Sequence, residues 1–153
     1  MMTGILLLSF LLTGCGSQEP QTGKKMSMYY INTAETKVEV HEQYLNTKTL
    51  DEQLDETMRY LSTTPEKLEY KAPLDMGFRV LDYEVEDGKL LINVDKAYSE
   101  LSPTTEVLVR AAIVRTLTQL PNVKYVGITV EDSQLYDNAG EMVGWMNAEQ
   151  FIN

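Results

Sequence analysis

The chain has 153 residues, of which 43% are hydrophobic and 24% charged, so it can bury the core of one domain of ordinary size. Aspartate and glutamate number 23 against 13 lysines and arginines, which gives a net charge of −10. This acidity argues against binding to nucleic acid and against lying flat on anionic lipid headgroups, but it does not select a function.

The first fifteen residues combine a short apolar run with the single cysteine of the chain. Residues 5–12 form an apolar run that is too short for a membrane span, which needs ~20 apolar residues, but that fits the core of a signal peptide. The single cysteine, Cys15, follows Leu12-Thr13-Gly14. This stretch resembles the lipobox of bacterial lipoproteins. The alternatives are a chance match in a buried helix and a secretory signal that is cut elsewhere.

The lipobox resemblance implies that residues 1–14 are a signal peptide, which is removed. Cys15 would then carry diacylglycerol on its thiol and an N-palmitoyl or similar acyl group on its new amine. Two or three acyl chains at ~0.8 kcal/mol per buried CH₂ make a lasting anchor. We therefore expect the protein at the outer face of the cell membrane, held by lipid. Residues 15–27 are polar and lack an apolar period, and are expected to be a flexible tether.

A hairpin is expected to open the folded domain. Residues 28–32 and 37–44 are predicted strands on either side of a turn. In the second strand, alternation places Val38 and Val40 on one face, and Glu39 and His41 on the other, polar face.

The next predicted element is a helix over residues 50–61. Thr49 and Glu52 have the spacing of a capping box, in which each side chain satisfies a backbone N–H of the other residue. An apolar stripe follows at helical spacing, formed by Leu50, Leu54, Met58 and Leu61. Residues 62–77 contain two prolines and are expected to form a loop, with one helical turn at 65–70.

A second hairpin is predicted over residues 78–94. In its first strand, residues 78–86, the alternation of apolar and polar residues is offset by one position between Val80 and Tyr83. This offset indicates a β-bulge. Asp87-Gly88 is a strong two-residue hairpin turn. The return strand then places apolar side chains on one face at Leu90, Ile92 and Val94.

The central predicted element is a helix from Pro103 to Leu120, which we expect to be the more buried of the two. Ser102 can cap it, and Pro103 occupies a first position that needs no N–H. Its apolar stripe is Val109, Ile113, Leu117 and Leu120, widened by Leu108, Ala111, Ala112 and Val114. After a turn at Pro121-Asn122, a strand is predicted in which Val126, Ile128 and Val130 alternate with other residues.

Together these elements predict an α+β domain over residues 28–131. We expect a mixed sheet of four to five strands with two helices packed on one face, in the order ββαββαβ. The last strand should pair with an earlier one through a crossover. Residues 132–153 form an extension that is too apolar for a free tail, because it includes Trp145 and Phe151. We expect this extension to dock on the domain; its alternative role is to meet a partner.

The sequence contains little that would support catalysis. His41 is the single histidine and is expected to lie at the surface, so a zinc site built on several histidines is excluded. Asp82, Glu84 and Glu86 share one strand face, which we interpret as solvated; a calcium site and a carboxylate-dependent wall hydrolase remain alternatives. We expect no cofactor and no enzymatic activity.

Two motif regions, Val80 to Val94 and Ala111 to Val130, resemble the GerMN domain of sporulation and spore germination lipoproteins of Gram-positive bacteria. The matching pieces are Asp87-Gly88, Ile92-Asn93-Val94, Arg115-Thr116-Leu117-Thr118 and Asn122-Val123-Lys124. The chain departs from the family in having one copy where some members carry two, and in having Ser62-Thr63-Thr64-Pro65 where a Gly-Pro element is common.

This resemblance implies a membrane-anchored, non-enzymatic lipoprotein that binds other envelope or sporulation proteins. Five aromatic residues are the predicted partner surface: Tyr29, Tyr30, Tyr44, Trp145 and Phe151. The tyrosines have an alternative role as half-buried strand residues. The alternative functions are a receptor for a small germinant or sugar, and the wall hydrolase named above.

Overall fold

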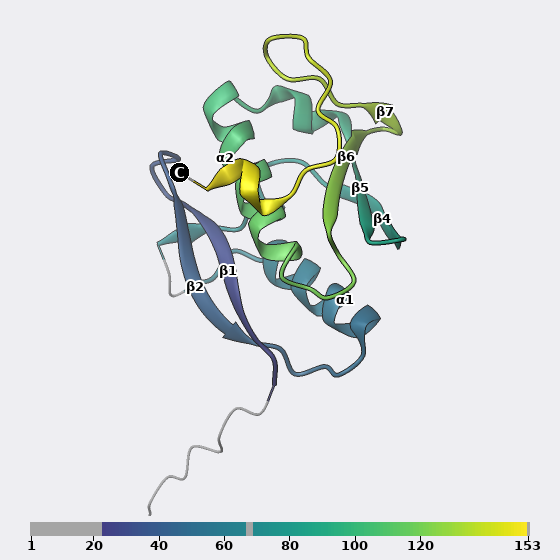
Figure 1. Ribbon diagram of the computed structural model, residues 1–153. Helices are drawn as coiled ribbons and strands as arrows, with labels where there is room; N and C mark the ends of the chain where they lie inside the picture. The colour runs from purple at the N-terminus through teal and green to yellow at the C-terminus, as the bar shows by residue number, and fades with distance from the viewer. Residues whose placement is uncertain (1–22, 67–68, 153) are drawn as a thin grey trace, which may run out of the picture.

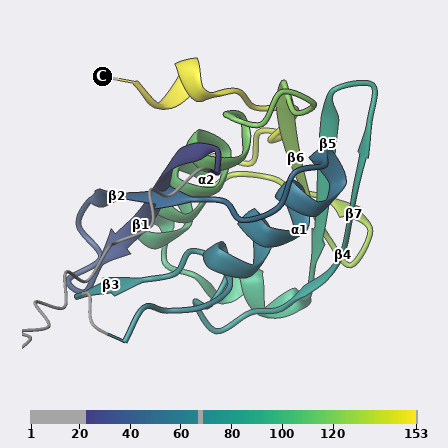
Figure 2. The ribbon, with the colours of Figure 1, turned by 90° about the horizontal axis from the view of Figure 1, so that it is seen from below.

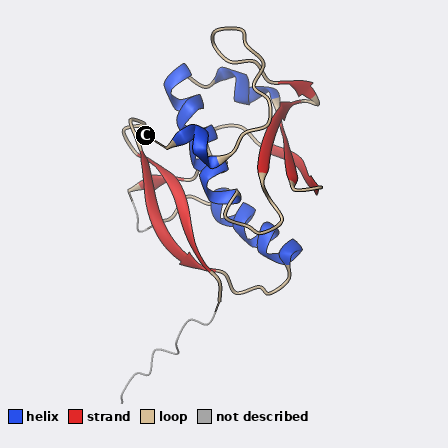
Figure 3. Ribbon diagram, viewed as in Figure 1, coloured by secondary structure: helices blue, strands red, loops and turns tan. Residues whose placement is uncertain are grey.

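The structure is a computed structural model that describes residues 23–66 and 69–152 (Figure 1). The predicted signal peptide, Cys15 and most of the predicted tether lie outside the described residues. The two helices lie between two β-sheets, as Figure 3 shows in blue and red and as the view in Figure 2 also shows. The α+β class and the predicted order of the main elements are confirmed, but the strands divide between two sheets where one was predicted.

The first sheet has three strands in the order β2-β1-β3. Strand β1 (Lys25–Asn32) and β2 (Val38–Tyr44) are antiparallel, as predicted. β1 begins inside the stretch expected to be tether, because Met26 alternates with Met28 and both side chains are fully buried. Because Met26 and Met28 are both packed in the core, the backbone around them is part of the strand and not of a flexible tether.

The predicted faces of β2 hold for Val38, which packs against the core, but not for Val40 and His41. The register places His41 opposite Met28 and Val40 opposite Tyr29. Since Met28 faces the core, the half-buried side of β2 carries His41, and Val40 is 52% exposed on the other side. The pattern within β2 alone could not reveal this, because β2 is an edge strand whose burial depends on its partner.

Helix α1 (Leu50–Leu61) begins with the predicted capping box at Thr49 and Glu52. Its stripe is buried except for Leu50, which lies in the first turn and is exposed. No helical turn is present among the described residues of 65–70; instead Tyr70–Lys71 forms β3, which pairs with the end of β1.

The second sheet has four strands in the order β4-β5-β6-β7. β4 (Val80–Glu86) pairs with β5 (Lys89–Val94) around Asp87 and Gly88, whose φ angles of 50° and 77° confirm the predicted tight turn. The ladder shifts register between Val80 and Asp82, which confirms the bulge. β5 is parallel to β6 (Tyr125–Val130), so the connection through α2 is a crossover. The two-residue β7 (Ser133–Gln134) completes the sheet.

Helix α2 (Pro103–Leu117) is capped by Ser102, as predicted, and follows a short 3₁₀ helix, η1 (Lys96–Glu100), that was not predicted. Its buried residues lie on several sides, including Val109, Ala111, Ala112, Ile113, Val114 and Leu117. A helix apolar on so many sides needs cover on more than one side. This explains why two sheets, one on each side, replace the single predicted sheet.

The open edge of β1 is closed by side chains from the last turn of α2 and from the turn that follows it. The Gln119 carboxamide pairs with the backbone of Ser27 as a neighbouring strand would: its oxygen accepts from the Ser27 N–H at 3.0 Å, and its nitrogen donates to the Ser27 carbonyl at 2.7 Å. Thr116 Oγ1 accepts from the Tyr29 N–H at 3.0 Å. These contacts satisfy backbone groups that would otherwise be an unpaired edge.

Replacing Gln119 with alanine is therefore expected to lower the free energy of unfolding by about 1–3 kcal/mol, because both Ser27 backbone groups lose a partly buried partner. Urea denaturation would measure this. Thr104→Ala, at an exposed position of α2, is the control and should change stability by less than about 0.5 kcal/mol. Equal stabilities of the two variants would contradict the pairing.

The C-terminal extension lies against the domain. Val126 in β6 and Met146 exchange both backbone hydrogen bonds, at 2.8 and 2.9 Å. Leu135, Val143 and Met146 are buried, and the short helix η2 (Ala148–Phe151) lies next to α2 (Figure 1). The extension thus adds apolar side chains to the core of the domain.

Candidate functional site

Among the described residues, the groups that could carry chemistry are dispersed. His41 is half-buried on β2, while Asp82, Glu84 and Glu86 are exposed along β4. No cluster of three or more metal-binding side chains occurs in the described part of the chain. The described helices also include none with the length and apolar character needed to cross a membrane.

The three tyrosines of the first hairpin do not form one surface. Tyr30 is only 3% exposed and stacks on Tyr70 with ring centroids 6.1 Å apart. Burial raises the pKa of Tyr30, and the neighbouring Tyr60 adds to the shift. Tyr29 points to the opposite face of β1, where the Arg115 guanidinium lies 4.3 Å from its ring centre. Tyr30 is therefore removed from the predicted partner surface, because strand alternation directs it to the core with Met26 and Met28.

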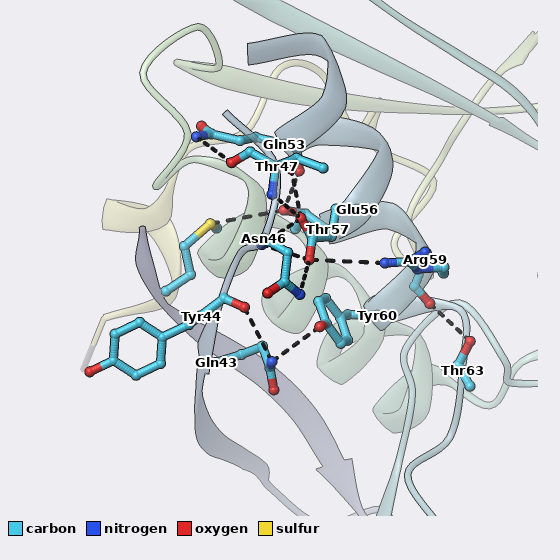
Figure 4. Close-up of polar contacts among 11 residues, drawn as sticks. Gln43, Tyr44, Asn46, Thr47, Gln53, Glu56, Thr57, Arg59, Tyr60 and Thr63 are labelled. Carbon is cyan, nitrogen blue, oxygen red and sulfur yellow. Dashed lines mark hydrogen bonds and ion pairs between the residues drawn. The ribbon is translucent and has the colours of Figure 1, made fainter. Parts of the chain in front are cut away.

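Tyr44, at the end of β2, remains half-buried and lies beside a polar cluster that holds the connection between β2 and α1 (Figure 4). Its ring points away from this cluster, and its carbonyl accepts a hydrogen bond from Gln43, which also donates to the Tyr60 hydroxyl. Tyr44 thus remains available at the surface, and its pairing with Lys25 places it on the same face of the hairpin as Tyr29, four residues along β1.

Glu56 is the centre of that cluster (Figure 4). Its carboxylate is 4% exposed and accepts hydrogen bonds from the backbone N–H groups of Asn46 and Thr47 at 2.9–3.0 Å, and from the Thr47 hydroxyl at 2.6 Å. Burial by itself raises the pKa of Glu56, but the hydrogen bonds from Thr47 and Asn46 outweigh it and hold the pKa below its ordinary value. The cluster is structural: it fixes the chain between β2 and α1.

The main exposed apolar surface lies on the outer face of the four-stranded sheet, the side away from the helices. Trp145 is 42% exposed and its ring lies over Gly127, where an added Cβ would lie 2.8 Å from the ring. Lys89 Nζ lies 5.4 Å from the Trp145 ring centre. Leu91, from the middle of β5, and Met142, from the extension, add exposed apolar area. We call Leu91, Gly127, Met142 and Trp145 the outer-face patch.

An acidic row borders this patch. Glu84 and Glu86 of β4 are paired across the ladder with Leu91 and Lys89. With Asp87, Lys89, Leu91 and Trp145 they line an open pocket of about 430 Å³. At the far end of the row, Asp82 accepts a hydrogen bond from Asn93 at 3.0 Å. The outer face is thus apolar at its centre and negatively charged along β4.

Of the five residues predicted as a partner surface, Trp145 alone lies in the outer-face patch, and Leu91, Met142 and Gly127 were not predicted. Leu91 could have been predicted, because it is an apolar residue on the solvent-facing side of β5. The residues that alternate with it, Leu90, Ile92 and Val94, are buried. Gly127 could not, because its importance depends on a ring contributed by a distant segment. Phe151, in contrast, is partly buried against the core beside α2 and is not part of the outer-face patch.

A partly buried ion pair lies beneath the extension. Arg110 contacts Glu106 through two hydrogen bonds, of 2.6 and 3.0 Å, and Glu106 also accepts from the buried Tyr98 hydroxyl at 2.8 Å. Burial, followed by the charge of Glu106, raises the pKa of Tyr98 well above its ordinary value. Arg110 also lies 3.9 Å from the Met146 sulfur. These contacts tie the extension to α2 near the outer-face patch.

A family model described as "Sporulation and spore germination" matches residues 27–136. The fold is similar to the first GerMN domain of the sporulation protein GerM from Bacillus subtilis, at 14% identity and a TM-score of 0.62, over 83% of this chain and 98% of that one. No curated protein matches the chain significantly.

Two further solved structures are similar. The tandem GerMN domains of the same Bacillus subtilis protein match at 17% identity with a TM-score of 0.56, and this chain, 88% of which is covered, spans 49% of that one. A candidate lipoprotein from Clostridium perfringens matches at 18% identity with a TM-score of 0.55, over 83% of this chain and 89% of that one. At these identities the likeness shows the fold alone.

Proposed function

The chain belongs to the family of sporulation and spore germination domains, the GerMN family, and on that premise we propose that it is a lipid-anchored extracytoplasmic protein that acts by binding other proteins. Its setting would be sporulation, germination or the cell envelope. The observation that carries the binding role is the outer-face patch: an exposed tryptophan, leucine and methionine lie together on a sheet face bordered by acidic groups. Contiguous exposed apolar area of this kind is typical of interaction sites.

The anchor is supported by the sequence before the domain and by one similar structure. Cys15 follows a short apolar run and a Leu-Thr-Gly element, and the Clostridium perfringens protein is named as a candidate lipoprotein. β1 begins at Lys25, so the part of the chain left between Cys15 and the first strand is short. The domain would then lie close to the outer face of the membrane, within reach of other envelope proteins.

Replacing Cys15 with serine is expected to release the protein from the membrane fraction, because serine cannot form the thioether that holds the lipid. Cell fractionation and mass spectrometry of the isolated protein would measure this. Ser17→Ala, two residues further along, is the control and should leave the protein in the membrane fraction. A Cys15→Ser protein that stays with the membrane at wild-type levels would contradict the anchor.

The binding role is tested by crosslinking in intact cells, with a photoreactive residue at the exposed position Met142. We expect specific protein adducts at Met142, and we expect fewer adducts at Glu100, an exposed residue outside the outer-face patch. If no protein adduct forms from any exposed position, the proposed role is wrong. Thermal shifts of several degrees with a metabolite panel would favour the small-ligand alternative.

A further inference from the structure

The longest edge of the four-stranded sheet has no strand beside it in the described chain. β4 lies at the end of the order β4-β5-β6-β7 and pairs only with β5 among the described strands. In a two-residue hairpin the residues next to the turn share two hydrogen bonds, and the pattern then alternates. Glu84 and Glu86 therefore direct their backbone groups to β5, while Tyr83 and Val85 direct theirs away from the sheet. Those outward N–H and C=O groups can accept another strand.

The edge is rigid enough to act as a template. The Tyr83 hydroxyl donates to the Asp55 carboxylate of α1 at 2.7 Å, which ties β4 to the helix layer. Burial, and after it the hydrogen bond to Asp55, raises the pKa of Tyr83 to about 12, so this hydroxyl remains a donor throughout the physiological range. At the other face of the strand, Asn93 holds Asp82 through a 3.0 Å hydrogen bond. β4 is thus fixed by contacts on both of its faces.

The charges along β4 select the kind of strand that could join it. Asp82, Glu84 and Glu86 all project from the outer face and are exposed. Like charges placed opposite each other on adjacent strands are unfavourable, so the same edge of a second copy would be repelled. Lysine or arginine at alternate positions of an incoming strand would lie beside these carboxylates. Neighbouring strands lie ~4.8 Å apart, so the long lysine or arginine side chains of the incoming strand would also reach toward the pocket that Leu91 and Trp145 line.

We propose that β4 is a docking edge for an extended segment of a partner protein that carries lysine or arginine at alternate positions and adds to the sheet as a further strand. Backbone hydrogen bonds to Tyr83 and Val85 supply the pairing, and the acidic row of β4 supplies the selectivity. The inference rests on the proposed protein-binding function and names the surface and the chemistry of the partner.

The first test uses the full chain in detergent micelles and a ten-residue peptide of alternating lysine and valine. We expect slower hydrogen exchange at the Tyr83 and Val85 amides, and a change in the fluorescence of Trp145, the single tryptophan of the chain. A peptide of alternating glutamate and valine should produce neither effect. If the basic peptide protects neither amide at concentrations up to about 1 mM, the proposal is overturned.

Two variants locate the binding. Val85→Pro removes an N–H that points away from the ladder, a position where edge strands tolerate proline, so it should fold and fail to bind the basic peptide. Glu84→Lys combined with Glu86→Lys changes only exposed side chains. This double variant should bind the basic peptide about tenfold or more weakly than the wild type does, and should bind the acidic peptide more tightly. Unchanged binding of the basic peptide by the double variant would overturn the proposal, whatever the folding of Val85→Pro.

Failure of this inference can be told apart from failure of the proposed function. Photoreactive residues are placed in intact cells at Leu81, on the docking edge, and at Val40, on the edge of the other sheet; both are exposed. Protein adducts at Leu81 support the inference. Adducts at Val40 or Met142 but none at Leu81 keep the binding role and overturn the docking edge, and adducts at no position overturn both.

Discussion

Replacing Glu56 with alanine is expected to lower the free energy of unfolding by about 3–5 kcal/mol near neutral pH. The carboxylate accepts hydrogen bonds from two backbone N–H groups, at Asn46 and Thr47, and alanine would leave both without an acceptor. The loss should appear as a lower urea midpoint. Glu141→Ala, at an exposed carboxylate, is the matched control and should change stability by less than about 0.5 kcal/mol.

The same site predicts a pH dependence, best measured as the difference between the wild type and Glu56→Gln. Because the folded pKa of Glu56 is lowered from 4.5, its contribution is fully present above that value and is lost as the pH falls through the folded pKa. The difference in unfolding free energy should therefore be constant above about pH 5.5 and shrink below about pH 4.5. Other carboxylates with lowered pKa values, such as Glu35 and Asp95, are present in both proteins, so their contributions to the pH dependence cancel in the difference. A difference that grows on acidification would contradict the assignment.

The second large effect is expected at the centre of α2. Ile113→Ala should lower the unfolding free energy by about 2–5 kcal/mol, because Ile113 is 1% exposed and packing on both sides of the helix prevents the cavity from closing. Val107→Ala on the same helix is the control, since Val107 is 44% exposed and should cost less than about 1 kcal/mol. Differential scanning calorimetry would compare them. A small effect at Ile113 would mean that α2 is less tightly packed than its position between the sheets implies.

The elements that were predicted correctly are those specified by neighbouring residues. The capping box at Thr49, the turn at Asp87-Gly88 and the bulge after Val80 each depend on a few adjacent positions. The start of α2 is equally local, because Ser102 and Pro103 define it. Its predicted end was too late: the helix stops at Leu117, and hydrogen-bonded turns carry Leu120 into the core instead.

What the sequence did not reveal depends on partners far along the chain. The division into two sheets follows from which strands meet, and β3 exists only because Lys71 comes to lie opposite Ile31. The burial of Tyr30 and the exposure of Val40 follow from the register between β1 and β2 and from the helices behind them. The same limit applies to the candidate site, where Trp145 was identified by its residue type but its place over Gly127 was not.

The closing of the β1 edge by Gln119 has a mechanical consequence. Chain tension that enters from the N-terminal side and acts along the axis of β1 would be resisted on both flanks of the strand: by the ladder to β2 on one side and by Gln119 and Thr116 on the other. Hydrogen bonds perpendicular to the pulling direction are loaded in shear and resist the force together. A strand pulled away sideways from its neighbour would instead lose its hydrogen bonds one after another. If the chain is anchored through Cys15 as proposed, the domain would in this way keep its shape while the membrane below it moves.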